Sequence, residues 1–470
     1  MRSPLLTALS NRWAAIAFAL SLGGCQVAAQ LPPASVGGQL TTTRSVIVQL
    51  FEWSWPDVAQ ECEAWLGPNG YGAVQISPPH EHLPFEQGPT SFSWQQRYQT
   101  ISYKLSSRSG NREQLAELIS RCHQAGVKVY VDMVVNPMAE DDKATDDSPV
   151  KISEVLVDSS KTQAEIATAM NELLAMGAAG FRLETSQPIP PEHIAAILRQ
   201  LHPLSPKFHP NGGRPLIYQD IGPTAVSQAH DYFGNGSISE VRYGRNLGEQ
   251  VRHGQLKNLV LFGEAWGLVP SHKAIVFTDN HRTQRSRDRN IVTFKAPADN
   301  GASYRLANIF MLAWPYGTPK VMSSYNWSQA PGPWVANQTN ENGQTLSIAC
   351  GDSWVCEHRW PAIANMVQFR NVTQTEPSVD HWWDNGNSQI AFARGDRGFV
   401  VINNEPTELR KTLMTGLPAG QYCNVLATST EVSNQAASQD CSTITVNPDG
   451  TAEFKVSPKQ AVALHIGARP

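Results

Sequence analysis

The chain has 470 residues, of which 41% are hydrophobic and 17% are charged, and its formal net charge is −4. This balance is typical of globular proteins and excludes an intrinsically disordered chain, while the length allows two or three domains. The mild negative charge argues against nucleic-acid binding, because contact with the phosphate backbone needs a basic surface.

The N-terminus has the pattern of an export signal. Arg2 and Arg12 accompany the apolar run 13–22, which is too short to cross a membrane as a stable helix. Leu22-Gly23-Gly24-Cys25 resembles the lipidation motif of bacterial lipoproteins. We therefore expect a signal peptide (1–24), a lipid on Cys25, a flexible tether (25–43) and sorting to the outer membrane, with the lipid as the only contact with a membrane. Secretion after cleavage a few residues later is the alternative.

Seven cysteines are present, so six remain if Cys25 carries lipid. An even number in an oxidising compartment suggests three disulfides, for which fifteen connectivities are possible. Local spacing favours Cys350–Cys356 and Cys423–Cys441, which leaves Cys62–Cys122.

Apolar strand patterns and helical patterns alternate along the first two thirds of the chain. The expected strands are 46–51, 73–76, 127–135, 179–183, 216–219 and 274–277, and the expected helices are 62–66, 111–125 and 164–176. Repeated strand–helix units with apolar strands predict a parallel sheet buried on both faces. A closed (β/α)8 barrel is the favoured α/β fold, and a doubly wound sheet is the alternative.

The pattern changes near residue 375. Short alternating strands are expected at 389–394, 398–403 and 461–466, with turn residues between them. This arrangement predicts an antiparallel β-sandwich at the C-terminus.

Motifs spread over most of the chain carry a family resemblance. They include residues 48–53 (VQLFEW), 180–184 (GFRLE), 231–236 (DYFGNG), 321–325 (VMSSY), 355–360 (VCEHRW) and 416–423 (GLPAGQYC). The chain thereby resembles the animal-type, chloride-dependent α-amylases of glycoside hydrolase family 13. The resemblance implies a (β/α)8 barrel over 44–374 with a shortened loop domain B at 137–165, an all-β domain over 375–470, the three disulfides favoured above, and α-1,4-glucans such as starch as the ligand.

The resemblance also assigns the catalytic positions, and all three are substituted. Glu184 stands at the nucleophile position, where the family has Asp, and Asp220 stands at the acid/base position, where the family has Glu. Arg282 replaces a third acid. The first two changes move each carboxylate by roughly 1.5 Å, a misplacement that can cost about 10²-fold in rate. We expect Arg282 to form an ion pair with Glu184 and to occupy the glucose site.

Other positions are retained. The resemblance assigns substrate binding to Trp94, Tyr98, Gln99 and His281, and chloride to Arg182, Asn280 and Lys320. Arg182 and Glu184 are two apart on a strand, so both should point into the barrel mouth. Simple ion pairing of Arg182 with Glu184 or Glu264 is the alternative to a chloride site.

Calcium binding is expected to be weak or absent. Asn136 is the remaining candidate ligand, and one carboxamide does not make a calcium site. Pro137 replaces a His that contacts sugar in the family, and a proline has no N–H to donate.

These observations leave three hypotheses about function for an expected monomer. The first is an α-glucan-binding lipoprotein that hydrolyses weakly or not at all. The second is a slow or altered retaining α-glucan hydrolase. The third is a scaffold that binds a protein partner.

Overall fold

The computed structural model describes residues 44–83, 94–135, 159–184, 189–221, 223–286, 288–295, 301–326, 339–340, 343–427 and 441–470. The lipidation candidate Cys25, the calcium candidate Asn136, Pro137 and most of the expected domain B lie outside these residues. Among the residues described, no helix combines the length and the apolar character needed to cross a membrane.

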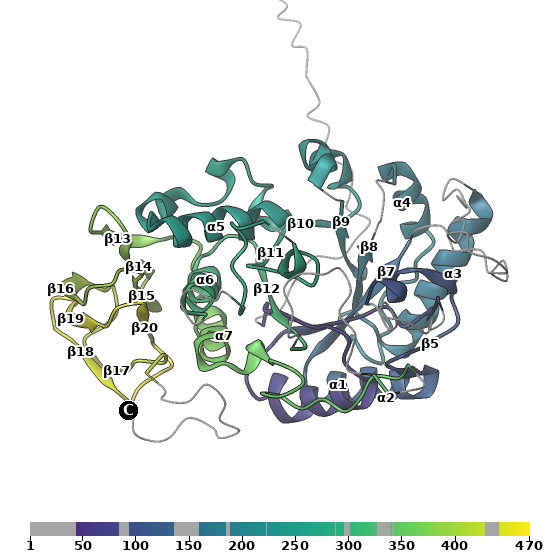
Figure 1. The fold of residues 1–470 in the computed structure, drawn as a ribbon, viewed down its shortest axis with the longest axis horizontal. Helices are drawn as coiled ribbons and strands as arrows, with labels where there is room; N and C mark the ends of the chain where they lie inside the picture. Colours follow the sequence, from purple (N-terminus) through teal and green to yellow (C-terminus); the bar gives the residue numbers. More distant parts are fainter. Residues whose placement is uncertain are drawn as a thin grey trace, which may run out of the picture. The chain divides into compact units, whose positions relative to one another are not determined.

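Eight parallel strands of the described residues close into a barrel, in the order β1-β12-β11-β10-β9-β8-β7-β2 (Figure 1). Their bounds are β1 Ile47–Leu50, β2 Ala73–Ile76, β7 Lys128–Val134, β8 Gly180–Glu184, β9 Leu216–Asp220, β10 Ser237–Ser239, β11 Ala274–Val276 and β12 Thr318–Ser323. The closed order confirms the predicted barrel and excludes the doubly wound sheet, which would have two open edges.

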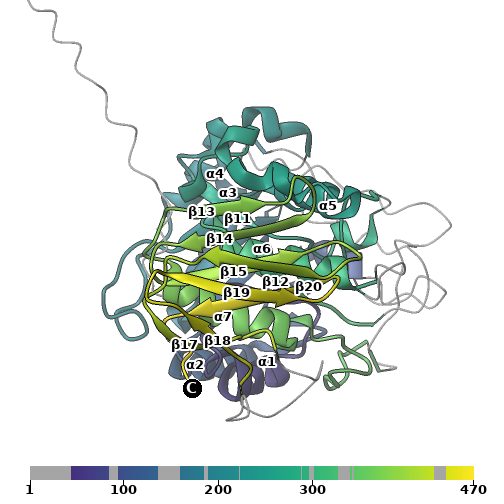
Figure 2. The ribbon, with the colours of Figure 1, turned by 90° about the vertical axis from the view of Figure 1, so that its left-hand side faces the viewer.

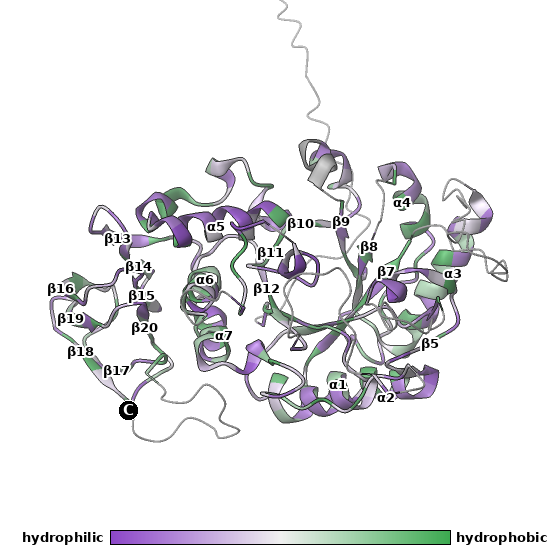
Figure 3. Ribbon diagram, viewed as in Figure 1, coloured by the Kyte–Doolittle hydropathy of each residue, from purple (hydrophilic) through white to green (hydrophobic). Residues whose placement is uncertain are grey.

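The barrel strands are buried on both faces, because helices surround them. Figure 3 shows hydrophobic residues along these strands and largely hydrophilic residues on α5, one of the surrounding helices. Gly180 lets β8 approach β9 closely, since a Cβ there would lie 2.3 Å from the carbonyl oxygen of Leu216.

The α-helices are α1 Trp55–Glu61, α2 Arg112–Gln124, α3 Ser160–Met176, α4 Pro191–Leu198, α5 Val241–His253, α6 Ala302–Ala313 and α7 Pro361–Thr373. The predicted helix 62–66 is a π-helical turn, η1 Cys62–Leu66, which continues α1. Helix α3 begins four residues before the predicted start, because the side chain of Ser159 accepts the N–H of Thr162 and caps it there.

Short 3-10 helices and two small two-stranded sheets connect these elements. The 3-10 helices are η2 Trp94–Tyr98, η3 Pro223–Tyr232, η4 Leu256–Leu261, η5 Glu264–Trp266, η6 Ser271–Lys273, η7 Thr283–Arg285 and η8 Glu357–Arg359. The small sheets pair β3 Glu81–His82 with β4 Thr100–Ser102, and β5 Ser106–Ser107 with β6 Gly110–Asn111.

The C-terminal region is antiparallel, as predicted, and its strands lie side by side in Figure 2. One sheet has the order β13-β14-β15-β20, and two further pairs are β16-β19 and β17-β18. The bounds are β13 Asp380–Asp384, β14 Gln389–Arg394, β15 Gly398–Asn403, β16 Leu409–Met414, β17 Gly420–Cys423, β18 Thr443–Val446, β19 Thr451–Val456 and β20 Gln460–His465.

The disulfides join Cys62 to Cys122, Cys350 to Cys356, and Cys423 to Cys441, which is the pairing that the resemblance implies. The first ties the end of α1 to α2, and the second closes a short loop before η8.

Candidate functional site

Strands β7, β8 and β9 bring acidic and basic residues together at the carboxyl end of the barrel. Asp132 on β7 is the register partner of Arg182 on β8, and Glu184 at the end of β8 is the partner of Asp220 at the end of β9. All four residues are buried. Arg182 and Glu184 face the same side of β8, as the two-residue spacing predicts, and they form the ion pair that was the alternative to a chloride site.

Arg182 is the centre of this cluster. Its Nη1 donates to Asp132 Oδ2 at 3.2 Å, and its Nη2 donates to Asp220 Oδ2 at 2.5 Å and also pairs with Glu184. Burial alone would lower the pKa of Arg182, but the three carboxylates raise it well above its ordinary value. The alternative partner Glu264 is exposed and accepts the backbone N–H of Ser271.

Arg282 makes the predicted ion pair with Glu184. Its Nη2 contacts Oε1 of Glu184, whereas Arg182 contacts Oε2, so the two guanidinium groups share one carboxylate. The side chain of Arg282 is 42% exposed and that of Glu184 is 1% exposed. Arg282 therefore lies between Glu184 and solvent.

The two carboxylates at the expected catalytic positions differ in their affinity for a proton. Burial raises the pKa of Asp220, but the charges of Arg182 and Arg282 outweigh burial and hold this pKa below the ordinary value. Burial raises the pKa of Glu184 above its ordinary value, and Asp220 acts in the same direction. Asp220 is thus the more readily ionised of the two.

A second layer of polar residues lies inside the barrel. Gln75 on β2 accepts hydrogen bonds from Tyr218 Oη at 2.7 Å and from Lys320 Nζ at 3.0 Å, and it donates to Asp132 Oδ1 at 2.7 Å. Burial, followed by repulsion from Arg182, lowers the pKa of Lys320 to about 7. When Lys320 is protonated, the formal charges of the cluster balance, with three carboxylates and three cations: Asp132, Glu184 and Asp220 against Arg182, Arg282 and Lys320.

Aromatic rings enclose His281 next to these charges. The imidazole stacks on Tyr98 at 5.2 Å and on Phe51 at 4.9 Å, and Trp94 contacts it edge-on at 5.2 Å. The side-chain nitrogen of Gln49 lies 3.0 Å from Nδ1 of His281. The other ring nitrogen, His281 Nε2, has no hydrogen-bond partner among the described residues. Burial lowers the pKa of His281 well below its ordinary value, so the ring is neutral.

The other substrate-binding candidates lie in or beside η2. Tyr98 is partly buried and donates to Asp132 Oδ2 at 2.9 Å, which joins the aromatic rings to the charge cluster. Trp94 is 8% exposed and packs edge-on against Tyr98 and His281, whereas Gln99 is exposed.

Asn280 holds the turn that carries Arg282. Its Oδ1 accepts the backbone N–H groups of Arg282 and Thr283, both at 2.9 Å. This leaves only its amide nitrogen for the anion-binding role that the resemblance implies.

The sequence had given no role to Asp132 or Gln75. Asp132 is one acid in the apolar strand VYVDMV, and Gln75 interrupts the apolar strand AVQI in the same way. A polar residue inside a strand that is buried on both faces needs a partner. The polar residue within each apolar strand could therefore have been noticed in the sequence. Its partner could not have been identified, because the partner depends on strand register.

Within the described ranges, no group of three or more His, Cys, Asp or Glu side chains is arranged to hold a metal ion. The calcium candidate Asn136 lies outside those ranges, so the expectation about calcium remains a prediction.

Comparisons with known proteins agree with this architecture. Residues 380–467 match the family model "Alpha amylase, C-terminal all-beta domain". The chain is 38% identical to a mouse pancreatic alpha-amylase, over 91% of this chain and 95% of that protein, and 37% identical to pig pancreatic alpha-amylase, over 89% and 93%. The crystal structure of alpha-amylase I from Eisenia fetida superposes with a TM-score of 0.83 at 35% identity, over 92% of this chain and 99% of that chain. A mutant of the same Eisenia enzyme, solved with maltohexaose, gives a TM-score of 0.82 at 34% identity, with the same coverage.

Proposed function

The chain belongs to the α-amylase family, and on that premise we propose that it binds α-1,4-glucans at the barrel mouth but hydrolyses them weakly or not at all. The observation that carries this proposal is the capture of Glu184 by two guanidinium groups. A carboxylate nucleophile must present an oxygen to the sugar carbon. Both oxygens of Glu184 are in ion pairs, and Arg282, the more exposed partner, separates this carboxylate from solvent.

The protonation states of the two carboxyl groups also argue against hydrolysis. A retaining glycosidase needs one ionised carboxylate as nucleophile and a second carboxyl group that holds a proton for the leaving group. Asp220, at the acid/base position, is paired with Arg182 and its pKa is held low. It therefore has no proton to donate near neutral pH.

Arg282 adds an electrostatic obstacle. The transition state of glycoside hydrolysis carries positive charge on the sugar ring. A guanidinium group at the position of the third acid would raise the energy of that state instead of lowering it.

The case for glucan binding rests on the retained aromatic residues. Tyr98 and His281 keep the residue types that the family uses to contact sugar, and the Nε2 atom of His281 has no partner within the described part of the chain. The relative from Eisenia fetida was solved as a complex with maltohexaose. His281 is fully buried beneath Tyr98, so we infer that a glucan chain lies against the partly exposed ring of Tyr98, above the Arg282–Glu184 pair.

Two measurements on the purified mature protein test this proposal. We expect retardation in starch-containing native gels without release of reducing sugar from soluble starch. Tyr98→Ala should abolish the retardation, while Tyr98→Phe, which keeps the ring, should preserve it. Starch hydrolysis that disappears in Glu184→Gln would refute the proposal.

A slow retaining hydrolase is the second candidate. The observation in its favour is that Glu184 and Asp220 are register partners on neighbouring strands, so two carboxyl groups still lie close together. The reducing-sugar assay separates it from the first candidate. A scaffold for a protein partner would show neither retardation nor hydrolysis.

Restoring the family's acids tests whether the charged cluster alone prevents hydrolysis. We expect little activity from the triple variant Glu184→Asp, Asp220→Glu, Arg282→Asp, because Pro137 and the shortened loop domain remain. Strong recovery of starch hydrolysis would contradict this expectation and would localise the defect to the three side chains.

We also propose a chloride site beside Arg182 and Lys320. Both side chains are buried, and burial followed by repulsion from Arg182 lowers the pKa of Lys320 to about 7, so Lys320 is only partly cationic near neutral pH. An anion next to both would offset that repulsion. When bound, it would supply a fixed negative charge near Asp220, and the amide nitrogen of Asn280 is the remaining group that could contact it.

We propose further that the mature chain is an outer-membrane lipoprotein anchored through Cys25. Fractionation of cells that express the full chain tests this proposal. The wild type should be found with membranes, and Cys25→Ser should not. A wild-type protein found wholly in the culture medium would favour the alternative of a secreted protein.

A further inference from the structure

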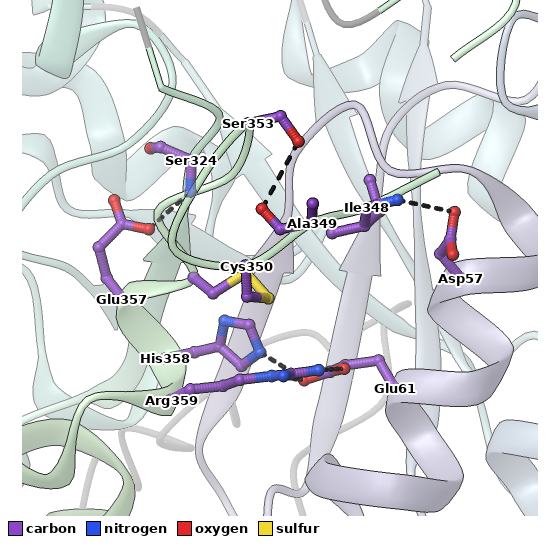
Figure 4. The surroundings of a disulfide bond; sticks show 11 residues. Asp57, Glu61, Ser324, Ile348, Ala349, Cys350, Ser353, Glu357, His358 and Arg359 are labelled. Atoms are coloured by element: carbon purple, nitrogen blue, oxygen red, sulfur yellow. Dashed lines mark hydrogen bonds and ion pairs between the residues drawn. A yellow bond between two sulfur atoms is a disulfide. The ribbon is translucent and has the colours of Figure 1, made fainter. Parts of the chain in front are cut away.

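The turn that carries His281 and Arg282 is connected to a segment more than sixty residues later in the chain. This segment, residues 343–360, contains the Cys350–Cys356 disulfide and helix η8. Figure 4 shows the disulfide between two sets of contacts, one with α1 and one with the residues that follow β12. We call residues 343–360 the disulfide strap.

The disulfide strap holds Ser324 through both of its backbone polar groups. Val355 N donates to Ser324 O at 2.8 Å. Ser324 N donates to the carboxyl Oε2 of Glu357 at 2.7 Å (Figure 4). Glu357 is fully buried, so this hydrogen bond does not compete with bulk water.

The side chain of Ser324 continues the connection towards the site. Its Oγ donates to Gln284 Oε1 at 2.5 Å, and Gln284 Nε2 donates to Asp279 Oδ2 at 2.8 Å. Gln284 also closes the turn, because its backbone N–H donates to Asn280 O at 2.9 Å. A continuous chain of hydrogen bonds therefore runs from Glu357 to both ends of the turn 279–285.

We propose that Glu357 is a positioning residue, which acts through Ser324 and Gln284 to fix the turn that carries His281 and Arg282. Its effect on glucan binding rests on the function proposed above, whereas its effect on the turn does not. Without Glu357, the N–H of Ser324 loses its acceptor. Gln284 then loses the rigid partner that orients its amide between β12 and the turn.

An acid at this position makes the arrangement sensitive to pH. Burial raises the pKa of Glu357 to about 8 and that of Asp279 to about 7, and each of these charges would repel the other. Tyr304, which donates to Asp279 at 3.2 Å, and the cationic Arg285 are the other ionisable groups that act on this pair. Glu357 Oε1 has no hydrogen-bond partner among the described residues, so the ionised form is poorly solvated. Near neutral pH Glu357 is therefore mainly protonated and serves as an uncharged acceptor.

The disulfide strap has a separate attachment to α1, which provides a control. Glu61 is the acceptor for His358 Nε2 at 2.8 Å and for Arg359 Nε at 2.8 Å (Figure 4). These contacts do not pass through Ser324. Removing the carboxyl group of Glu357 should therefore loosen the turn without detaching the strap.

The test compares Glu357→Ala, Glu357→Gln and the control Glu61→Gln in the full mature protein. Hydrogen–deuterium exchange of the peptide that covers residues 279–286 is the main measurement. We expect about fivefold faster exchange in Glu357→Ala, as for the loss of one hydrogen bond, and wild-type exchange in Glu357→Gln, whose amide oxygen still accepts from Ser324 N. Glu61→Gln should leave this peptide unchanged.

A pH series distinguishes positioning from a purely structural role. Between pH 6.5 and pH 9.5, exchange of the turn in the wild type should increase relative to Glu357→Gln at the same pH. Asp279 ionises in both proteins, but only the wild type gains a second, poorly solvated charge at position 357 that repels it. Equal behaviour of the two proteins over this range, or equally fast exchange in Glu357→Gln and Glu357→Ala, would overturn the proposal. If Glu357→Ala does not fold, the pH comparison with Glu357→Gln decides alone.

Loss of retardation in starch gels should accompany faster exchange. If the wild type itself is not retarded, the proposed function fails while the exchange data still test Glu357.

Discussion

Replacing Arg182 by Met should destabilise the protein far more than replacing Arg282 by Met, although both guanidinium groups contact Glu184. The side chain of Arg182 is 1% exposed, and its partners Asp132, Glu184 and Asp220 are 0%, 1% and 8% exposed. Removing one member of a buried ion pair costs about 3–5 kcal/mol, because the other charge stays buried without a partner. Here one substitution would leave three carboxylates without their shared cation.

Arg282 differs because water can replace it. Its side chain is 42% exposed, and Glu184 keeps its contact with Arg182 when Arg282 is removed. Ion pairs with an exposed member contribute about 0–1 kcal/mol. We therefore expect the two variants to differ by about 3 kcal/mol in the free energy of unfolding at pH 7.

Urea-induced unfolding followed by tryptophan fluorescence measures this difference. Methionine keeps most of the apolar stem of arginine, so lost packing should contribute little. Acid should narrow the gap, because the carboxylates left without Arg182 gain raised pKa values and are neutralised as the pH falls towards 4. Equal destabilisation in the two variants, or a gap that widens in acid, would refute the assignment of Arg182 as the centre of the cluster.

Other residues give further predictions. Burial would raise the pKa of Glu61, but hydrogen bonds and charge from His358 and Arg359 outweigh it and lower this pKa to about 2. The stability that ionised Glu61 provides should therefore be lost as the pH falls from about 4.5 towards 2. Glu61→Gln should show a shallower decline of melting temperature over this range. Tyr98→Phe should cost about 1 kcal/mol in unfolding free energy through the lost bond to Asp132, and chemical denaturation should measure this loss. Sodium chloride should raise the melting temperature above that in sodium gluconate of equal ionic strength, and Lys320→Met should remove the difference; no difference in the wild type would count against the chloride site.

The barrel could be predicted from sequence because many of its strands are recognisable from their own short runs of apolar residues. Runs such as 127–135 and 216–219 are mostly apolar, which indicates strands buried on both faces, and the structure places β7 and β9 there. The alternating pattern near 389–403 predicted antiparallel strands, and β14 and β15 pair in that way. Closure of the barrel was the favoured interpretation from the length of the strand–helix region, because the patterns predicted six of the eight strands and missed β10 and β12.

The site was predicted less completely. The ion pair between Arg282 and Glu184 could be expected from charge alone, once both residues were assigned to the barrel mouth. The link from Gln75 through Asp132 to Arg182 could not, because it depends on the relative register of three strands, which no local pattern specifies. The hydrogen bond between Glu357 and Ser324 could not be predicted either, since it joins residues 33 positions apart.

The balanced charges of the barrel mouth also bear on how this site could change over generations. Exchanging Arg282 for an acid in one step would replace a cation by an anion next to Glu184 and Asp220, leaving the cluster with an excess of two negative formal charges. Such an intermediate would have a lower free energy of unfolding, and selection would remove it before any gain in catalysis could appear. If hydrolysis is lost as proposed, an acid at position 282 can be tolerated only together with a second substitution or after a compensating cation has appeared, so the balanced cluster itself opposes reversion.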